Sequence, residues 1–524
     1  MSTSSHSDQV KDLDLEKGST QAPQEGDVVS ADDGVKRKSG ALAPLWKVAE
    51  KLDSYGVEVR GVERVEEHER AEKSTWLEPG FLWMSANMTI STFSLGTLGN
   101  SIWFMQPADA CLTILFFNLF TTLPVALFST WGKQTGLRQM MIGRFSFGPW
   151  TILFPILLNC LACIGWSTIN TIVGASALHA VTDTHQLPEP AGIVIIAVIT
   201  LFVALFGYKY VHAIERYSSI PVFVIFLIML GQAGRFMHGG YGGVGEAEAA
   251  SVLSFGGTIA GFSLGWTSLA ADYTVYQRAN TANWKIFLST YVGLNVPLVF
   301  VESLGALMMS TLDVKETWAA VAKNEDGSTN LGGLLGAPLI GPMGGFGRFL
   351  LVVLALSIVA NNIPNVYSFA LTFQAFGKYA QRIPRFFLCI VCTIIYIVLA
   401  EAGYTSFEAA FDTLLILLSY WLAIYTCILL EEHFIFRGGK FANYNLHRYN
   451  DRSNLPVGIA AAFSLCCGIA GAVVGMSQTW YVGPIGRMIG DPKYGADLGF
   501  ELAFGFTAVT YPVTRYLERK YTGR

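Results

Sequence analysis

Two of the long apolar runs in this chain are interrupted at corresponding places. The first run spans 80–104 and is broken at Ser94–Gly99, whereas the sixth spans 252–276 and is broken at Gly256–Gly257 and Gly261–Gly265. Interrupted apolar segments at matching positions of two halves are typical of secondary transporters built from inverted repeats. The pattern therefore predicts two inverted repeats of five helices, with a substrate site where the two broken helices face each other.

The composition indicates an integral membrane protein. Of the 524 residues, 52% are hydrophobic and 14% are charged, whereas a soluble domain has about 25% charged residues. An apolar run of roughly 20 residues crosses the hydrocarbon core as a helix, because lipid offers no partner to open backbone groups. We expect an all-α fold with twelve membrane spans at 80–104, 109–131, 149–181, 189–208, 217–236, 252–276, 286–311, 346–377, 385–402, 406–430, 456–476 and 496–515.

Positive charge is concentrated in the loops that follow the even-numbered spans and in the C-terminal tail. Such loops face the cytosol, so both termini are expected on the cytosolic side. We expect a cytosolic, largely disordered tail at 1–75, because its first part is rich in charge and poor in aromatic residues. A ten-helix core at 76–435 is followed by a cytosolic loop with two further helices at 436–516 and by a tail at 517–524.

The eighth span carries an unusual cluster of amides, Ala360-Asn361-Asn362-Ile363-Pro364-Asn365. Three amides within five residues of a membrane helix are hard to explain by packing, because polar groups in a bilayer are costly unless they pair or line a wet cavity. Asn361 and Asn365 share one helix face, and Pro364 frees a backbone carbonyl. An amide offers both a donor and an acceptor without charge, so the cluster favours a neutral heterocyclic ligand.

In the third span, Trp166 and Asn170 are four residues apart and share one helix face. A flat heterocycle would stack on the indole and accept or donate a hydrogen bond at the amide. The alternative is an interfacial tryptophan beside an asparagine that bonds a neighbouring helix. Trp166 lies in the middle of the span rather than at a membrane boundary, which weakens that alternative.

The sixth span contains Phe262 and Trp266, a second pair of aromatic residues at helical spacing. Gly261 and Gly265 flank Phe262 and allow the helix to unwind, which frees backbone donors and acceptors. One of the two aromatic rings would close on the ligand from the side opposite Trp166. The alternative is that the glycines serve close packing between helices.

Ser91 and Thr92 lie beside the break of the first span, where a hydroxyl would contact the substrate or a cation. The commoner fate of such hydroxyls is a bond to their own helix. Glu302 lies within the seventh span and Asp272 at the end of the sixth. A buried carboxyl can take up and release a proton, so both are candidates for proton coupling. A structural acid that pairs with another helix is the alternative.

Four segments resemble the fungal purine–cytosine permeases, a branch of the nucleobase–cation symporter-1 family. The segments are Trp83–Met88, Gly165–Asn170, Ala271–Thr274 and, most specifically, Ala360–Asn365. The resemblance runs from about residue 46 to the C-terminus. It implies a LeuT-type fold with broken helices 1 and 6 and two additional C-terminal helices.

The resemblance also implies proton-coupled import of cytosine and purines such as adenine, guanine and hypoxanthine across the fungal plasma membrane by alternating access. Uptake of 5-fluorocytosine is expected as well. The ligand would stack between aromatic rings of the third and sixth spans and bind amides of the third and eighth. These roles would fall on Trp166, Phe262 or Trp266, Asn170, Asn361 and Asn365, with Ser91 or Thr92 as a hydroxyl contact and Asn362, Pro364, Gly261 and Gly265 shaping the site.

Other functions stay open at this stage. Relatives in the same branch carry vitamin B6, and other branches carry uracil or allantoin. An enzyme or a nutrient sensor is disfavoured, because the eight histidines are scattered and no catalytic motif occurs in a suitable context. Ser357 is the one hydroxyl in Ala355–Ala360, which favours a proton over sodium as the coupling ion. We expect no cofactor, metal or nucleic acid, the nucleobase and the lipid bilayer as partners, and leave homo-oligomerisation open.

Overall fold

The fold is known from a computed structural model, which describes residues 43–53, 61–70, 74–182, 184–206, 208–324, 327–491 and 493–524. The tail that we expected to be disordered falls mostly outside these residues. The chain divides into two compact units, residues 1–48 and 49–524. Helix α2 (Ala43–Asp53) begins in the first unit and ends in the second.

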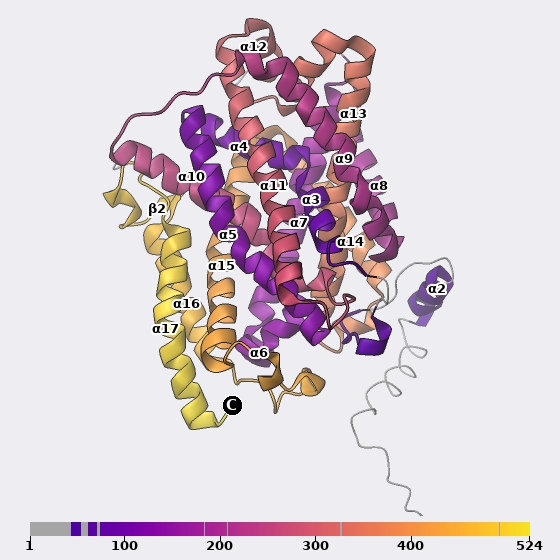
Figure 1. The fold of residues 1–524 in the computed structure, drawn as a ribbon, viewed down its shortest axis with the longest axis vertical. Coiled ribbons are helices and arrows are strands. Elements are labelled where there is room, and N and C mark those ends of the chain that lie inside the picture. Colours follow the sequence, from indigo (N-terminus) through magenta and orange to yellow (C-terminus); the bar gives the residue numbers. More distant parts are fainter. Residues whose placement is uncertain are drawn as a thin grey trace, which may run out of the picture. The chain divides into compact units, whose positions relative to one another are not determined.

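The described residues of 49–524 form a helical bundle with a small hairpin, β1 (Ser477–Gln478) and β2 (Tyr481–Val482) (Figure 1). Helix α13 packs most extensively on α7, and α11 packs on α4 and α5. The helices are α3 (Glu78–Asn87), α4 (Ile90–Ser101), α5 (Pro107–Thr135), α6 (Gln139–Thr151), α7 (Leu153–His179), α8 (Glu189–Phe206), α9 (Tyr208–Ala233), α10 (Glu246–Leu264), α11 (Asn283–Ser310), α12 (Glu316–Ala322), α13 (Leu331–Gln374), α14 (Arg385–Gly403), α15 (Phe407–Glu431), α16 (Ile459–Gly475) and α17 (Gly499–Thr522).

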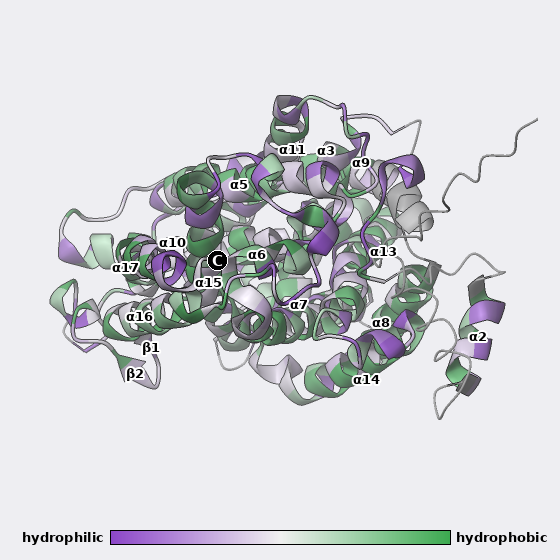
Figure 2. Ribbon diagram, turned by 90° about the horizontal axis from the view of Figure 1, so that it is seen from below, coloured by the Kyte–Doolittle hydropathy of each residue, from purple (hydrophilic) through white to green (hydrophobic). Residues whose placement is uncertain are grey.

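Every expected span has a helical counterpart. Seven helical stretches within the described residues are long and apolar enough to cross a membrane, and α8 and α16 are shorter apolar helices. Figure 2 shows the helices mainly in the colours of hydrophobic residues, with hydrophilic residues concentrated in the connecting segments. Large apolar side chains on the outside, such as Phe116 and Phe120 of α5 at 63% and 66% exposure, fit a lipid-facing surface.

The first span is broken, but not where the sequence led us to expect. Helix α3 ends at Asn87, Thr89 is fully extended with φ −143° and ψ 166°, and α4 begins at Ile90. The expected break at Ser94–Gly99 is helical. Gly96 serves packing instead, because a Cβ there would lie 1.8 Å from the carbonyl oxygen of Glu302 in α11.

The sixth span also unwinds later than expected. Helix α10 continues through Gly256–Gly257 and ends at Leu264, and two short 3₁₀ turns follow, η3 (Gly265–Ser268) and η4 (Ala270–Tyr273). Gly261 belongs to the regular helix, and a Cβ on it would lie 1.8 Å from the carbonyl oxygen of Leu415 in α15. The alternative that this glycine serves close helix packing is therefore correct, and unwinding begins at Gly265.

Helix α13 passes through Pro364 with helical backbone angles, so the proline does not break it. Its sharp bend lies at Gly344, where φ is +54° and ψ is −125°, a conformation that favours glycine. The segment before this bend, from Leu331, is a helix that the sequence analysis did not identify. Helix α17 runs to Thr522, beyond the expected end of the span at 515.

A buried ion-pair network ties α17 to the end of α15. Glu432 is fully buried, and its two carboxylate oxygens accept hydrogen bonds from Arg515 at 2.9 and 3.1 Å. Tyr511 donates to the same carboxylate at 3.0 Å, and Arg437 donates at 2.9 Å. A buried charge with several donors is stable where an unpaired one is not, so this network holds the last helix against the core.

Candidate functional site

A chain of hydrogen bonds joins the first, third and eighth spans next to the break between α3 and α4. Ser91 Oγ donates to Asn170 Oδ1 at 2.6 Å, and Asn170 Nδ2 donates to Asn361 Oδ1 at 2.6 Å. Asn361 Nδ2 in turn donates to the carbonyl oxygen of Ala86. All three side chains are buried. Two amides and one hydroxyl expected at the site thus meet in one place.

Two aromatic residues expected at the site meet beside this chain. The rings of Trp166 in α7 and Phe262 in α10 have centroids 4.9 Å apart and are inclined at 85°, an edge-to-face contact. Phe411 of α15 also contacts Trp166, with ring centroids 6.1 Å apart and an interplanar angle of 78°. An aromatic cluster therefore lies where the third, sixth and tenth spans approach each other.

Trp266 faces a different neighbour. Its indole Nε1 donates to Asn87 Oδ1 at 3.1 Å, and its ring lies 5.1 Å from that of Trp83 in α3. Asn87 Nδ2 donates to the carbonyl oxygen of Trp83 at 2.9 Å. Trp266 therefore fastens the unwound part of the sixth span to the end of α3, and Phe262 is the ring that pairs with Trp166.

A small cavity lies beside these aromatic residues. It has a free volume of about 10 Å³, about the space that one water molecule needs. Phe262 and Trp166 touch across it, so a flat ring can enter only if the two side chains move apart. The cavity is lined by Asn159, Ala162, Cys163, Trp166, Phe262, Gly265, Trp266, Leu269 and Asn365.

Three of the expected residues do not join the amide chain. Thr92 lies with its hydroxyl 3.5 Å from that of Thr89, so Ser91 rather than Thr92 joins the amide chain. Asn362 is fully buried on the side of α13 near Tyr396 of α14. Asn365 lines the small cavity, but its Nδ2 donates to the carbonyl oxygen of Asn361 at 3.1 Å within the same helix.

Asn87 and Phe411 contact the expected site residues Trp266 and Trp166, and the sequence analysis did not identify them. Asn87 is a polar residue inside an apolar run, fully buried, and such residues mark functional positions in membranes. That signal was present in the sequence. Phe411 gave no signal, because a phenylalanine within an apolar span is the commonest kind of core residue.

The two carboxylates have different surroundings. Glu302 of α11 is fully buried, and its Oε2 accepts from Asn118 Nδ2 of α5 at 2.7 Å. Its Oε1 has no hydrogen-bond partner within the described part of the chain. Asp272 of η4 instead accepts from the backbone N–H of Gln139 at 2.7 Å, and its carbonyl oxygen accepts from Arg138 at 2.7 Å. Asp272 therefore anchors the start of α6.

Comparison with known proteins agrees with this architecture. Residues 64–495 match a family described as permeases for cytosine/purines, uracil, thiamine and allantoin. The chain is 45% identical over 523 residues to the purine-cytosine permease fcyB of Emericella nidulans, covering 98% of this chain and 99% of that protein. It is 32% identical to the vitamin B6 transporter of Saccharomyces cerevisiae, with 91% of this chain and 90% of that one covered.

Among solved structures, the fold resembles the inward-facing conformation of Mhp1. The TM-score is 0.61 at 14% sequence identity, and the likeness covers 88% of this chain and 96% of Mhp1. At this identity the likeness establishes the fold alone.

Proposed function

Because the chain belongs to the family of permeases for cytosine/purines, uracil, thiamine and allantoin, we propose that it imports cytosine and purines, among them adenine, guanine and hypoxanthine, together with a proton. The antifungal 5-fluorocytosine is expected to enter by the same route. The proposal is supported by the high identity to a purine-cytosine permease along almost the whole chain.

The observation that carries the choice of substrate is the bond between Asn170 and Asn361, next to the rings of Trp166 and Phe262. An amide can donate and accept in the plane of a nucleobase edge, and an aromatic ring can stack on its face. In our proposal the base enters between Trp166 and Phe262 and takes over hydrogen bonds that the two amides and Ser91 make with each other in its absence.

The contacts also favour alternating access. The amide chain links the break of the first span to α7 and α13, and Trp266 links the unwound sixth span to α3 through Asn87. A base that binds between these elements changes contacts on both broken helices at once. It shifts the equilibrium between two conformations only by its difference in affinity for them. The contacts with the two broken helices are the source of that difference, and they couple binding to the conformational change.

We assign the proton to Glu302 rather than to Asp272. Glu302 receives one hydrogen bond from Asn118, whereas its second oxygen is open to a proton within the described structure. Its backbone carbonyl lies against Gly96 of α4, so Glu302 lies where α11 packs closely on the first span. Asp272 already accepts a hydrogen bond from the N–H of Gln139, which suits a structural role at one end of the bundle.

The end of the bundle that carries α6 and the C-terminus is taken as cytosolic, because the positive loops after the even-numbered spans lie there. Residues 61–70 are held at this end, where Val65 N donates to Gly136 O at 2.8 Å and Arg64 Nε to Thr135 O at 2.8 Å. In our proposal the protein lies in the plasma membrane and the opposite end, with α12, faces outward.

The test is uptake of radiolabelled cytosine by yeast that lacks its own cytosine transport and expresses this chain, at several external pH values. We expect saturable uptake that increases as the pH falls. Asn361→Ala should abolish it while the protein still reaches the cell surface. Asn295→Ala is the control for loss of another buried amide bond between spans, to Thr122 at 2.8 Å. It is compared by cytosine affinity at one fixed pH, because Thr122 also donates to the carbonyl oxygen of Asn118, the partner of Glu302. Wild-type affinity in Asn361→Ala would contradict the proposal.

Vitamin B6 is the second candidate substrate, because a vitamin B6 transporter is 32% identical over most of both chains. Competition separates the two. Unlabelled adenine should block cytosine uptake, whereas pyridoxine and uracil should not. Stronger competition by pyridoxine than by adenine would favour the vitamin.

A further inference from the structure

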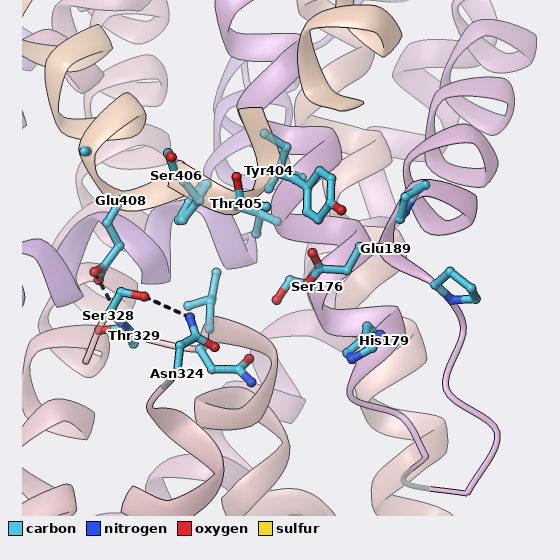
Figure 3. A pocket seen from close by; sticks show the side chains of 18 of the residues that line it. Ser176, His179, Glu189, Asn324, Ser328, Thr329, Tyr404, Thr405, Ser406 and Glu408 are labelled. Carbon is cyan, nitrogen blue, oxygen red and sulfur yellow. Dashed lines mark hydrogen bonds between the residues drawn. The ribbon is translucent and has the colours of Figure 1, made fainter. Parts of the chain in front are cut away.

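Two cavities of different chemistry open on the helical bundle, apart from the amide chain. The cavity in Figure 3 has a volume of about 800 Å³, and its lining includes many polar side chains, such as Ser176, Asn324 and Glu408. The other is a groove of about 380 Å³ between α7, α15 and α16. Aliphatic and aromatic side chains line this groove, and none of the described residues in its lining is charged. The groove therefore selects an apolar occupant.

The groove opens sideways toward the membrane. Leu161 of α7 and Val473 of α16 line it and are 54% and 39% exposed, so its open side is the lipid-facing side of the bundle. Along α16 the lining extends from Leu465 to Met476, a length of about 16 Å at a rise of about 1.5 Å per residue. Half of the hydrocarbon core is about 15 Å thick. The groove thus has the length of one acyl chain from a single leaflet.

One end of the groove lies beside an exposed arginine. Phe154 lines the groove, and Trp150 lies four residues before it, one helical turn away. The guanidinium of Arg452 lies over the Trp150 ring, 4.5 Å from its centroid, and both side chains are exposed. The neighbouring Asp451 pairs with Arg448 instead. Arg452 therefore presents a positive charge at the mouth of the groove, next to an indole of the kind found at membrane boundaries.

A second arginine adds positive charge at this end. Arg144 of α6 donates to Asn450 Oδ1 at 2.5 Å and to the carbonyl oxygen of Ala375 at 2.8 Å. Both acceptors are neutral, so the charge of Arg144 is not cancelled by them. Arginine suits phosphate groups, and basic residues beside the cytosolic ends of membrane helices attract the anionic lipids of that leaflet. Because this end of the bundle is the one taken as cytosolic, its charge complements an anionic headgroup.

The groove shares a wall with the small central cavity. Ala162 lines both the groove and that cavity, and it lies one turn before Trp166 on α7. A Cβ on Gly165 would lie 2.9 Å from Cδ1 of Leu414, which also lines the groove. An occupant of the groove therefore lies against the turn of α7 that carries Trp166.

We propose that the groove is a binding site for one anionic phospholipid. An acyl chain lies between α7, α15 and α16, and the phosphate headgroup lies at Arg452 and Trp150. The bound chain supports the turn of α7 that holds Trp166. This inference does not depend on the identity of the transported molecule.

The test is photolabelling of the purified full-length chain in detergent micelles with phosphatidylserine that carries a diazirine on one acyl chain, followed by peptide mapping. We expect labels concentrated on 154–162, 414–425 and 465–476, the segments that line the groove. Arg452→Gln should reduce this labelling about fivefold, the worth of one arginine near anionic lipid. The same probe with a phosphatidylcholine headgroup should label the wild type about as weakly as phosphatidylserine labels Arg452→Gln.

Two matched controls separate the site from general contact with lipid. Arg348→Gln, at an exposed arginine of α13 outside the groove, should leave the labelling unchanged. Leu417→Trp should fill the groove and reduce labelling by both probes, because Leu417 lines it and is 40% exposed. Leu399→Trp, at an exposed leucine of α14 outside the groove, should not. Arg452 is exposed, so its substitution gives a result even if Leu417→Trp fails to fold.

Three results would overturn the proposal. Labels spread evenly over the lipid-facing helices, or equal labelling by the two headgroups, would show only general contact with lipid. Displacement of the probe by inorganic phosphate as well as by unlabelled phosphatidylserine would show an anion site that needs no acyl chain. Displacement by a sterol better than by phosphatidylserine would show a sterol site. The proposed function would stand in each case.

Discussion

Asn170 of the third span donates a hydrogen bond to Asn361 of the eighth span at 2.6 Å, and each also bonds an element of the first span. The effects of substituting these two residues on cytosine affinity should therefore not be additive. We expect the double variant Asn170→Ala/Asn361→Ala to show a coupling energy of about 0.5–3 kcal/mol in cytosine affinity. The measurement is a double-mutant cycle on binding. Asn170→Ala combined with Asn295→Ala should be additive, and additivity in both pairs would contradict a shared role.

The two tryptophans near the small cavity should behave differently. Trp166→Leu removes the stacking face and should weaken cytosine binding by about 1–3 kcal/mol, a factor of about 5 to 150. Trp266→Phe keeps an aromatic ring but loses the hydrogen bond to Asn87 and part of the ring volume. Because Trp266 is not the stacking ring, cytosine binding should change less. Direct binding to purified protein gives the comparison. If Trp266→Phe weakened binding more than Trp166→Leu, the assignment of the stacking pair would be reversed.

Glu302→Gln should separate binding from proton coupling. The amide can still meet Asn118 but cannot exchange a proton, so cytosine uptake should lose its rise at low pH while cytosine binding persists. Uptake between pH 4.5 and 7.5, measured beside binding at each pH, tests this. Asp272→Asn is the comparison and should keep the slope of the pH profile. An unchanged pH dependence of uptake in Glu302→Gln would show that another residue carries the proton.

Two glycines of α10 give a matched pair for stability. A Cβ at Gly261 would overlap the carbonyl oxygen of Leu415, whereas a Cβ at Gly257 would meet no atom within 4 Å. Gly261→Ala should therefore lower the melting temperature of the purified protein. Gly257→Ala should leave it unchanged or raise stability by up to about 1 kcal/mol, because alanine restricts the unfolded chain. Equal melting temperatures of the two variants would show that α10 can shift away from α15 at residue 261 without loss of stability.

The sequence predicted the spans, because the thickness of the bilayer fixes the length of an apolar helix that crosses it. It also identified the amides of the eighth span, because polar side chains in a membrane helix need partners. It misplaced the break of the first span and placed that of the sixth too early, since unwinding begins only at Gly265, the last residue of the predicted interruption. Gly96 and Gly261 looked like points of unwinding, but they let α4 and α10 approach other helices, and composition does not distinguish these two uses of glycine. The break itself falls at Met88–Thr89, which contain no glycine at all.

The sequence also could not decide whether Ser91 or Thr92 joins the amide chain. Adjacent hydroxyls point to faces about 100° apart on a helix, so the register of α4 decides which one reaches Asn170. That register depends on the break before Ile90, which the sequence did not locate. Asn87 could have been identified as a buried amide, whereas Phe411 gains its importance only from its contact with Trp166.

The bonds among Ser91, Asn170 and Asn361 have a consequence for release. In the structure these groups satisfy one another, so under our proposal an arriving base replaces existing bonds. The net gain is the small difference between two sets of similar bonds. Under this proposal the protein holds the base only moderately. When the base leaves, the amides bond each other again, and no polar group is left without a partner in the membrane.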